Sequence, residues 1–259
     1  MNDNDHLYNH DPLADSAGVP WEGRSFEPNS FAGDDGSADP ALIAAIESLR
    51  SGSGNVAAVV DAFRSARLLV PLLAKLGESE VGVHGQVVDK SADLSIVTVE
   101  TPDQQNGLPV FSSVESMKTW NTDARPVPVD AVKAALAAAQ EGNTRIILDA
   151  GSPTEFVIRR PAIAAVAQGL PWSHPSKDDR VHAAFAAATA ELPEILGFEL
   201  ADIDPQSVLA AAELQLELRL VADLEREKLD EVLQGLAKAL AESHDIAEYV
   251  DSLRVKLVS

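Results

Sequence analysis

ELQLELRL, residues 213–220, is the stretch that best indicates how this chain folds, because leucine occupies every second position. A period of two residues is that of a β-strand with one face in a hydrophobic core and the other in water. The leucines lie at positions 214, 216, 218 and 220, and the residues between them are polar: Glu213, Gln215, Glu217 and Arg219. We therefore expect the leucines to be buried and the polar face to be solvated or to bind a partner.

The sequence around this strand predicts a small helix-on-sheet module over residues 177–259. A helix over 178–191 and a hairpin partner, GFELADIDP at 197–205, precede the strand. An amphipathic helix and the strand LRVKLV at 253–258 follow it, and a strand–helix–strand unit normally has parallel strands. The resulting order of helix, strand, strand, helix and strand resembles half of a ferredoxin-like fold. In LRVKLV we expect the apolar residues to face inward: Leu253, Val255 and Leu257.

Strands and helices also alternate over residues 39–170, which predicts a second domain of the same α+β class. The proline-rich, charged segment GLPWSHPSKDD at 169–179 is the expected boundary. Asp39 and Asp130 each precede an apolar periodic segment and are expected to cap a helix. The fold class is therefore mixed α+β, with two small helix-on-sheet domains and an extended N-terminal tail.

Several local patterns in this second domain give more detailed expectations. Pro71 in RLLVPLL, 67–73, predicts an edge or irregular strand, because proline cannot donate to a β-ladder. Ser112 and Glu115 form a capping-box pattern. The remaining expectations are an exposed loop or weak hairpin over 75–93, a hairpin between LSIVTVET at 94–101 and LPVFSS at 108–113, an edge strand RPVPV at 125–129, and buried strands at 145–150 and 155–160.

The N-terminal tail, residues 1–38, is acidic and polar, with nine acidic residues and one arginine among the first 40 residues. This composition is typical of a disordered segment. However, three of the chain's aromatic residues recur every five positions in its second half: Trp21, Phe26 and Phe31. We expect residues 18–38 to form an aromatic docking strip, with Arg24 bound to a carboxylate, or to recognise another protein.

The formal net charge of −21 disfavours nucleic acid and anionic membrane surfaces as partners, because a field of that sign repels phosphate groups. The chain has no cysteine, which excludes disulfides and thiolate chemistry. No signal peptide or apolar run of membrane-spanning length is apparent, so we expect a cytoplasmic protein.

No motif in the sequence predicts a catalytic, cofactor-binding or metal-binding residue. There is no G-x-S-x-G elbow, P-loop lysine or dinucleotide-binding glycine pattern. Asp149 is a candidate ligand residue, because it ends a predicted buried strand, where open sheets usually place ligand sites. Arg67 and Arg159 could bind anions, although internal carboxylates are the favoured partners. Trp120 and Trp172 are further candidates for docking or ligand binding.

Four motifs carry a resemblance to a known family: VPL at 70–72, VFSS at 110–113 before a helix ending at Trp120, RPV at 125–127 and LDAG at 148–151. With them, residues 65–172 resemble the SseB family, named for enhanced serine sensitivity, and its actinobacterial branch in particular. The segments PWEGR at 20–24 and FAGDDGSADP at 31–40 and the C-terminal module are also similar to that branch. The resemblance implies an SseB N-terminal domain followed by an SseB-type C-terminal module, in a family with no established activity, cofactor or catalytic residues.

These observations favour a non-enzymatic interaction or regulatory protein, which would act through a protein partner. A sensor of small molecules such as amino acids, with a site near Asp149 and an arginine, is the alternative. A hydrolase or transferase whose site is assembled only in space is a third possibility.

Overall fold

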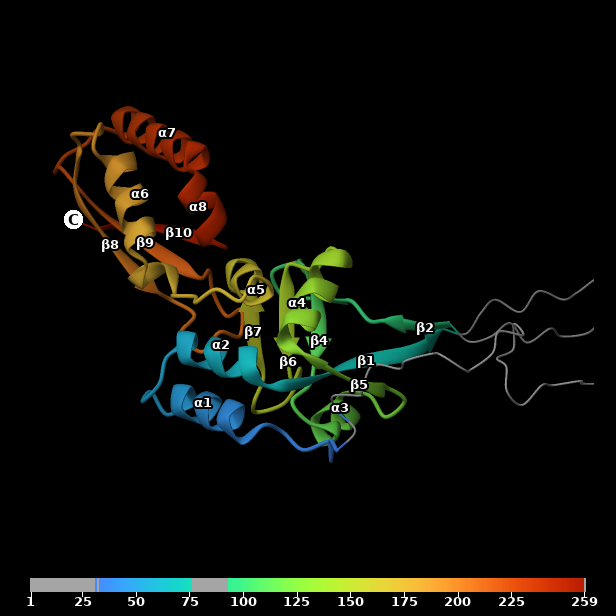
Figure 1. The fold of residues 1–259 in the computed structure, drawn as a ribbon. Coiled ribbons are helices and arrows are strands. Elements are labelled where there is room, and N and C mark those ends of the chain that lie inside the picture. Colours follow the sequence, from blue (N-terminus) through green and yellow to red (C-terminus); the bar gives the residue numbers. More distant parts are fainter. Residues whose placement is uncertain (1–30, 32, 76–92, 259) are drawn as a thin grey trace, which may run out of the picture. The chain divides into compact units, whose positions relative to one another are not determined.

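The computed structural model describes residues 31, 33–75 and 93–258. The chain groups into two units, Met1–Asp35 and Gly36–Ser259. In the first unit, the Asp34 N–H donates to the Phe31 carbonyl at 3.0 Å and closes a turn. The second unit contains every helix and strand of the described residues and has the mixed α+β fold predicted from the sequence (Figure 1). No helix in the described ranges is long and apolar enough to cross a membrane.

Two capped helices open the second unit, α1 (Pro40–Arg50) and α2 (Val56–Ser65). The Asp39 carboxylate accepts from the N–H of Ala41 and Leu42, which confirms the predicted cap. Asn55 caps α2 in the same way by accepting from the Ala58 N–H. Such side-chain acceptors satisfy N–H groups that have no partner within the helix, and they fix where each helix begins.

A three-stranded antiparallel sheet follows, in the order β2 (Asp93–Ile96), β1 (Arg67–Lys75), β5 (Arg125–Asp130). Of the two alternatives for the strand that contains Pro71, edge or irregular, the edge strand is wrong, because β1 is the central strand of this sheet. Pro71 pairs with Pro126 of β5, where neither residue has an N–H to donate. On the other side of β1, Leu69 forms a bridge with Phe111, and the pairing with β2 begins at Leu72. Pro71 lies between these two pairings. The RPVPV strand is at the edge, as predicted.

A four-stranded sheet has the order β3 (Val99–Glu100), β4 (Asn106–Val110), β6 (Arg145–Leu148), β7 (Phe156–Arg159). The predicted hairpin is present between β3 and β4. However, the first residues of LSIVTVET, 94–96, belong to β2 and pair with β1 in the three-stranded sheet. Strands β6 and β7 are buried at every position, as expected. Helices α4 (Ala131–Gln140) and α5 (Arg160–Ala167) pack on this sheet, and Asp130 caps α4 as predicted.

The capping box of helix α3 (Val114–Trp120) is shifted by one residue from the prediction. Ser113 is the N-cap, and Ser116 is the residue that returns the hydrogen bond. Ser112 is not available for capping, because its hydroxyl donates to the Asp149 carboxylate at 2.7 Å.

The C-terminal part contains a third sheet in the order β10 (Leu253–Val258), β9 (Leu214–Leu220), β8 (Ile195–Asp202). Strands β9 and β10 are parallel and β8 is antiparallel to β9, as the sequence predicts. Its helices are the short 3-10 helix Pro175–Lys177, α6 (Asp179–Thr189), α7 (Arg226–Glu242) and α8 (His244–Tyr249). Helix α8 is an addition to the predicted order.

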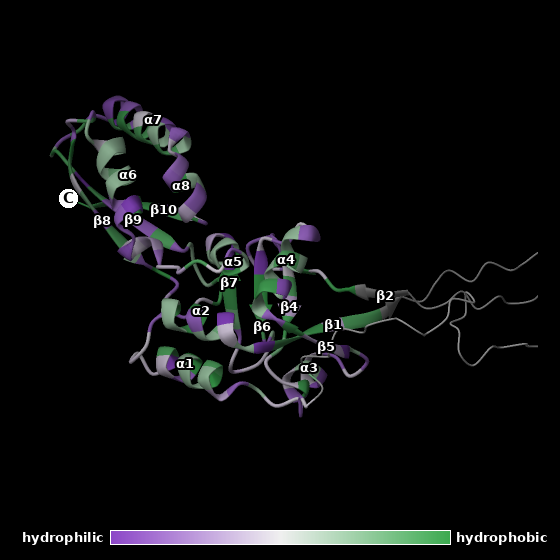
Figure 2. Cartoon of the chain, in the orientation of Figure 1, coloured by the Kyte–Doolittle hydropathy of each residue, from purple (hydrophilic) through white to green (hydrophobic). Residues whose placement is uncertain are grey.

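Burial in this sheet differs from the expectations at two places. The leucines at 214, 216 and 218 are buried as predicted, but Glu213 and Gln215 on the opposite face are also buried, at 3% and 5% exposure. Val255 and Leu257 lie on the same face as the core leucines, as expected, but they are 44% and 43% exposed because β10 is an edge strand. Figure 2 shows hydrophobic residues along β4, β6 and β7, whereas hydrophilic and hydrophobic residues alternate along α7. The face of the third sheet that carries the leucines is therefore only partly covered at β10. The opposite face is partly buried at the start of β9.

Candidate functional site

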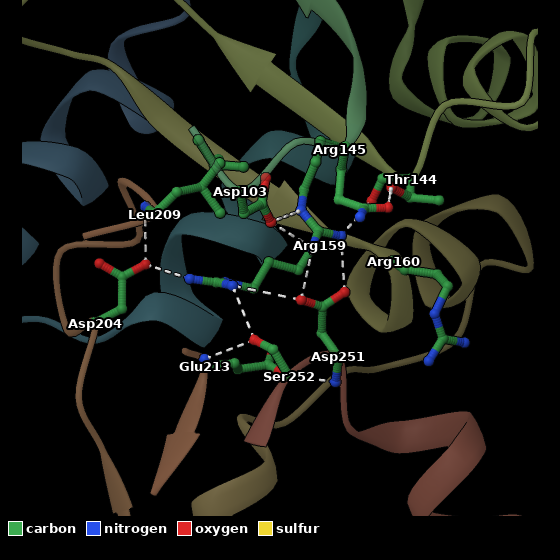
Figure 3. A network of polar contacts seen from close by, with 12 residues as sticks. Asp103, Thr144, Arg145, Arg159, Arg160, Asp204, Leu209, Glu213, Asp251 and Ser252 are labelled. Atoms are coloured by element: carbon green, nitrogen blue, oxygen red, sulfur yellow. Dashed lines mark hydrogen bonds and ion pairs between the residues drawn. The ribbon is translucent and has the colours of Figure 1, made fainter. Parts of the chain in front are cut away.

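A buried network of arginine and carboxylate side chains surrounds the start of β9 (Figure 3). Arg145 opens β6 and Arg159 ends β7, and the antiparallel register places them opposite each other. Each side chain is only 5% exposed. Because a buried guanidinium is costly without a charged partner, the carboxylates around these two residues decide whether the arrangement is stable.

Asp251, between α8 and β10, joins the two arginines. Arg145 binds both Asp251 carboxylate oxygens, at 2.7 and 2.9 Å, and binds Asp103 at 2.7 Å. Arg159 donates to Asp251 at 3.3 Å, to Asp204 and to the Ala211 carbonyl. Paired hydrogen bonds of this kind fix geometry as well as charge. The network therefore connects the four-stranded sheet to the loops of the C-terminal sheet.

Asp204 lies in the loop after β8 and is held by backbone groups as well as by Arg159. Its carboxylate accepts from three successive N–H groups, those of Val208, Leu209 and Ala210, at 2.9 to 3.3 Å. The loop reaches this conformation with positive φ angles at Ser207 and Leu209. These three N–H groups and Arg159 together fix the position of the Asp204 carboxylate.

Glu213 is the one carboxyl of the network whose pKa is strongly raised, to about 7. Burial is the main cause, and the negative charge of Asp251 adds to it. The Asp251 N–H, which donates to Glu213 Oε2 at 2.8 Å, and the two arginines oppose the shift. Since Asp103, Asp204 and Asp251 already more than balance the two charges of Arg145 and Arg159, ionisation of Glu213 adds an uncompensated buried charge.

The pKa values of two further groups, His174 and Asp103, are shifted in ways that follow from their surroundings. Burial lowers the pKa of His174, although the Asp202 carboxylate, 3.7 Å from the ring, opposes that shift. Burial raises the pKa of Asp103, but the hydrogen bonds from Thr101 and Arg145 outweigh it, so this pKa is lowered. His174 is therefore neutral and Asp103 ionised near pH 7.

Two cavities adjoin the network. A small cavity of about 10 Å³, roughly the size that one water needs, is lined by residues that include Arg159, Trp172, His174, Asp204 and Glu213. A larger groove of about 580 Å³ lies between the α1–α2 loop and the segment before α6. Its polar lining includes Asn55, His174, Lys177, Asp202 and Gln206. The groove has the size of small-molecule sites.

Asp149, the predicted ligand residue, is completely buried and has a φ of +50°. Its carboxylate accepts from the Ser112 N–H and hydroxyl and from the hydroxyls of Ser116 and Thr154, at 2.7 to 2.8 Å. These bonds tie the start of α3 to the turn between β6 and β7. A ligand could reach Asp149 only by displacing them.

The other candidate residues fall into two neighbourhoods. Arg67 donates to the carbonyls of Ser112 and Ser37, so it lies near Asp149, and Trp120 packs on Phe111 with ring centroids 5.3 Å apart. Arg159 and Trp172 line the small cavity. Phe31 is described, but Trp21, Arg24 and Phe26 lie outside the described residues, as does the loop or hairpin expected over 75–93. The docking of the strip therefore stays a prediction.

Sequence reasoning missed most of the network: Arg145, His174, Asp204, Glu213 and Asp251. One signal was present, because an arginine opens the buried strand RIIL and another ends FVIR. Charged residues within buried strands require buried partners, but their identity depends on the tertiary fold. Within the part of the chain that the structure describes, no group of three or more His, Cys, Asp or Glu side chains could hold a metal ion.

The fold and the site together define a mixed α+β protein in which buried ion pairs join the four-stranded sheet to the loops of the C-terminal sheet. Residues 42–165 match a family model described as the SseB protein N-terminal domain. This match agrees with the resemblance to an SseB N-terminal domain that the sequence motifs indicated. No curated protein and no solved structure matches the chain.

Proposed function

We propose that this chain is a non-enzymatic interaction or regulatory protein of the SseB family. In this proposal the C-terminal part is an SseB-type module and the closest likeness is to the actinobacterial branch. The observation that carries the proposal is the edge strand β10, which leaves Val255 and Leu257 more than two-fifths exposed beside an unpaired strand edge in the described structure. Exposed apolar side chains on an open strand edge are typical of surfaces that bind proteins.

The buried network supports the same function. It holds the loop before β10 through Asp251 and the loop between β8 and β9 through Asp204, so the edge strand belongs to a sheet that is fixed at one end by ion pairs. Recognition surfaces built on rigid elements lose less conformational entropy on binding.

A comparison of three baits tests the proposal: the wild-type chain, Leu257→Arg and Leu136→Arg. Leu136 is the matched control, because it is a leucine of similar exposure, 47%, on α4. We expect specific proteins to be recovered from native lysate by the wild type and by Leu136→Arg, and to be lost with Leu257→Arg. Equal recovery by all three baits, or none above background at low and moderate salt, would contradict the proposal.

Sensing of a small molecule is the second candidate, and the groove of about 580 Å³ is the observation that favours it. An α-amino acid could place its carboxylate near Lys177 and its ammonium near Asp202, and both residues line the groove. The sensor site is thus proposed here and not at the filled surroundings of Asp149.

A thermal-shift measurement with a panel of amino acids at millimolar concentration tests this second candidate. We expect a true ligand at ten times its Kd to stabilise the fold by about 1.4 kcal/mol, a rise of a few degrees in Tm. Lys177→Gln should remove that rise, whereas Lys238→Gln, on an exposed face of α7, should leave it. Flat curves across the panel would exclude amino acids as ligands.

A further inference from the structure

We infer that β10 is the docking edge for an acidic, extended segment of a partner protein, which adds to the sheet as a fourth strand. The inference rests on the proposed interaction function and specifies the chemistry of the partner. Such strand addition gives affinity through main-chain hydrogen bonds and specificity through alternate side chains.

The first step of the argument is the backbone of β10. From Leu253 to Val258 the strand pairs on one side with β9, and no described residue pairs with its other side. A strand of six residues with one unpaired side presents a row of N–H and C=O groups to solvent. Unless it is blunted, such an edge is a template for a further strand.

The second step is the apolar face. Val255 and Leu257 pair with Leu216 and Leu218 of β9 in the parallel register, so they share the face of the sheet that carries the core leucines. Those core leucines are completely buried, whereas Val255 and Leu257 are 44% and 43% exposed. An added strand with aliphatic residues on this face would extend the core and cover both side chains.

The third step is the charge on the other face. Arg254 and Lys256 both point away from the core face, and both are exposed. Lys256 reaches Glu217 at 2.9 Å, and no ion pair of Arg254 is found among the described residues. In a chain with a net charge of −21, this edge is locally cationic. Opposite charges on directly facing positions of neighbouring strands stabilise the pair.

The same charges argue against a second copy of β10 as the occupant. An antiparallel pair of β10 strands centred on Val255 would place Arg254 directly opposite Lys256 of the other copy, which is destabilising. A shift of one residue would place aliphatic side chains on the charged face. A segment in which carboxylates alternate with aliphatic residues avoids both conflicts, and it is the occupant to which the edge is complementary.

Fluorescence anisotropy with labelled peptides and the full chain tests this inference. The probe is a short peptide in which glutamate alternates with valine, and the controls are the same peptide with lysine for glutamate and one of the same composition with its glutamates grouped together. We expect the alternating acidic peptide to bind at least about tenfold more tightly than either control and to weaken as salt is raised.

Variants of the chain locate the binding. Arg254→Gln with Lys256→Gln should remove the preference for the acidic peptide, and Arg254→Glu with Lys256→Glu should invert it. Lys133→Glu with Lys238→Glu is the matched control, because it makes the same change of net charge at exposed positions outside β10. Circular dichroism verifies that each variant is folded. If charge reversal next to Glu217 disrupts the sheet, the double glutamine variant still tests the inference.

Three results would overturn the inference: no peptide binding, equal affinity for the acidic and basic peptides, or an unchanged preference in the glutamine variant. Dimerisation in sedimentation velocity that the glutamine variant abolishes would also overturn it, in favour of a second copy. If the peptides fail while Leu257→Arg still loses a partner from lysate, the partner's acidic chemistry is wrong and the interaction function stands.

Discussion

Replacement of Arg159 with methionine is expected to lower the free energy of unfolding by about 3–5 kcal/mol, the usual cost of removing one partner of a buried ion pair. The substitution leaves Asp204 and part of the Asp251 carboxylate without their cation, although the side chains of both aspartates are at most 3% exposed. Methionine fills a similar volume, so the loss reports the uncompensated charges and not a cavity. Urea unfolding followed by circular dichroism measures it.

Lys133→Met is the control for this experiment. Lys133 pairs with Asp130 at 3.3 Å, but both side chains are largely exposed, at 69% and 49%. Exposed pairs of this kind contribute about 0–1 kcal/mol. A loss below 1 kcal/mol in Arg159→Met would mean that the carboxylates are solvated or protonated, contrary to the arrangement described.

The double variant Arg159→Met with Asp204→Asn makes the origin of the loss explicit. The single carbonyl oxygen of asparagine can still accept from the N–H groups of Val208 and Ala210, which bond to the same carboxylate oxygen of Asp204, and asparagine carries no charge. We expect the double variant to be more stable than Arg159→Met alone. A double-mutant cycle of these two substitutions should therefore give a favourable interaction energy between Arg159 and Asp204, as expected of a direct ion pair.

The parts of the fold that local chemistry determines could be predicted from the sequence. Asp39 and Asp130 fix the starts of two helices because a carboxylate before an apolar periodic segment satisfies N–H groups of the first turn. The alternation of leucine in β9 correctly predicts its buried face. The parallel arrangement of β9 and β10 follows from the helix between them.

The errors arise where tertiary neighbours decide. Pro71 lies in a central strand because another proline, Pro126, faces it, and one sequence segment does not show which residue will face another. Glu213 has the pattern of a solvated residue, yet it is buried beside Asp251 and Arg159. Val255 has the pattern of a core residue, but the edge position of its strand leaves it exposed.

The candidate site was less predictable than the fold for the same reason. Arg159 could be chosen from the sequence, since an arginine at the end of a buried strand needs a partner. Its partners, Asp204 and Asp251, are 45 and 92 residues further along the chain and lie in loops. Loops carry no periodicity that would mark a buried carboxylate.

Replacement of Glu213 with glutamine is expected to remove most of the loss of stability that the wild-type chain shows between pH 5 and pH 8. The pKa of this carboxyl is raised from 4.5 to about 7 by burial. Below about pH 4.5 the carboxyl is protonated in both the folded and the unfolded chain, and the stability that it contributes is fully present. As the pH rises through 7, the folded chain must ionise a buried group that the unfolded chain ionises freely, so this stability is lost.

The size of the effect follows from the shift. At 1.36 kcal/mol per pKa unit, the wild type should lose about 2–3 kcal/mol relative to Glu213→Gln between pH 5 and pH 8. His174 acts in the opposite direction, because its lowered pKa makes the fold less stable as the pH falls below about 6.5, its ordinary value. The difference between wild type and variant at each pH isolates Glu213, since both chains retain His174 and the surrounding charges of Arg145, Arg159, Asp202, Asp204 and Asp251.

Glu199→Gln is the matched control, because Glu199 lies on the neighbouring strand β8 and is exposed. It should leave the dependence of stability on pH unchanged. Parallel pH curves for the wild type and Glu213→Gln would mean that Glu213 is ionised in the folded chain throughout this range. Asp251 contacts both Glu213 and the two arginines, so ionisation of Glu213 places a further negative charge beside the contacts that hold the loop before β10.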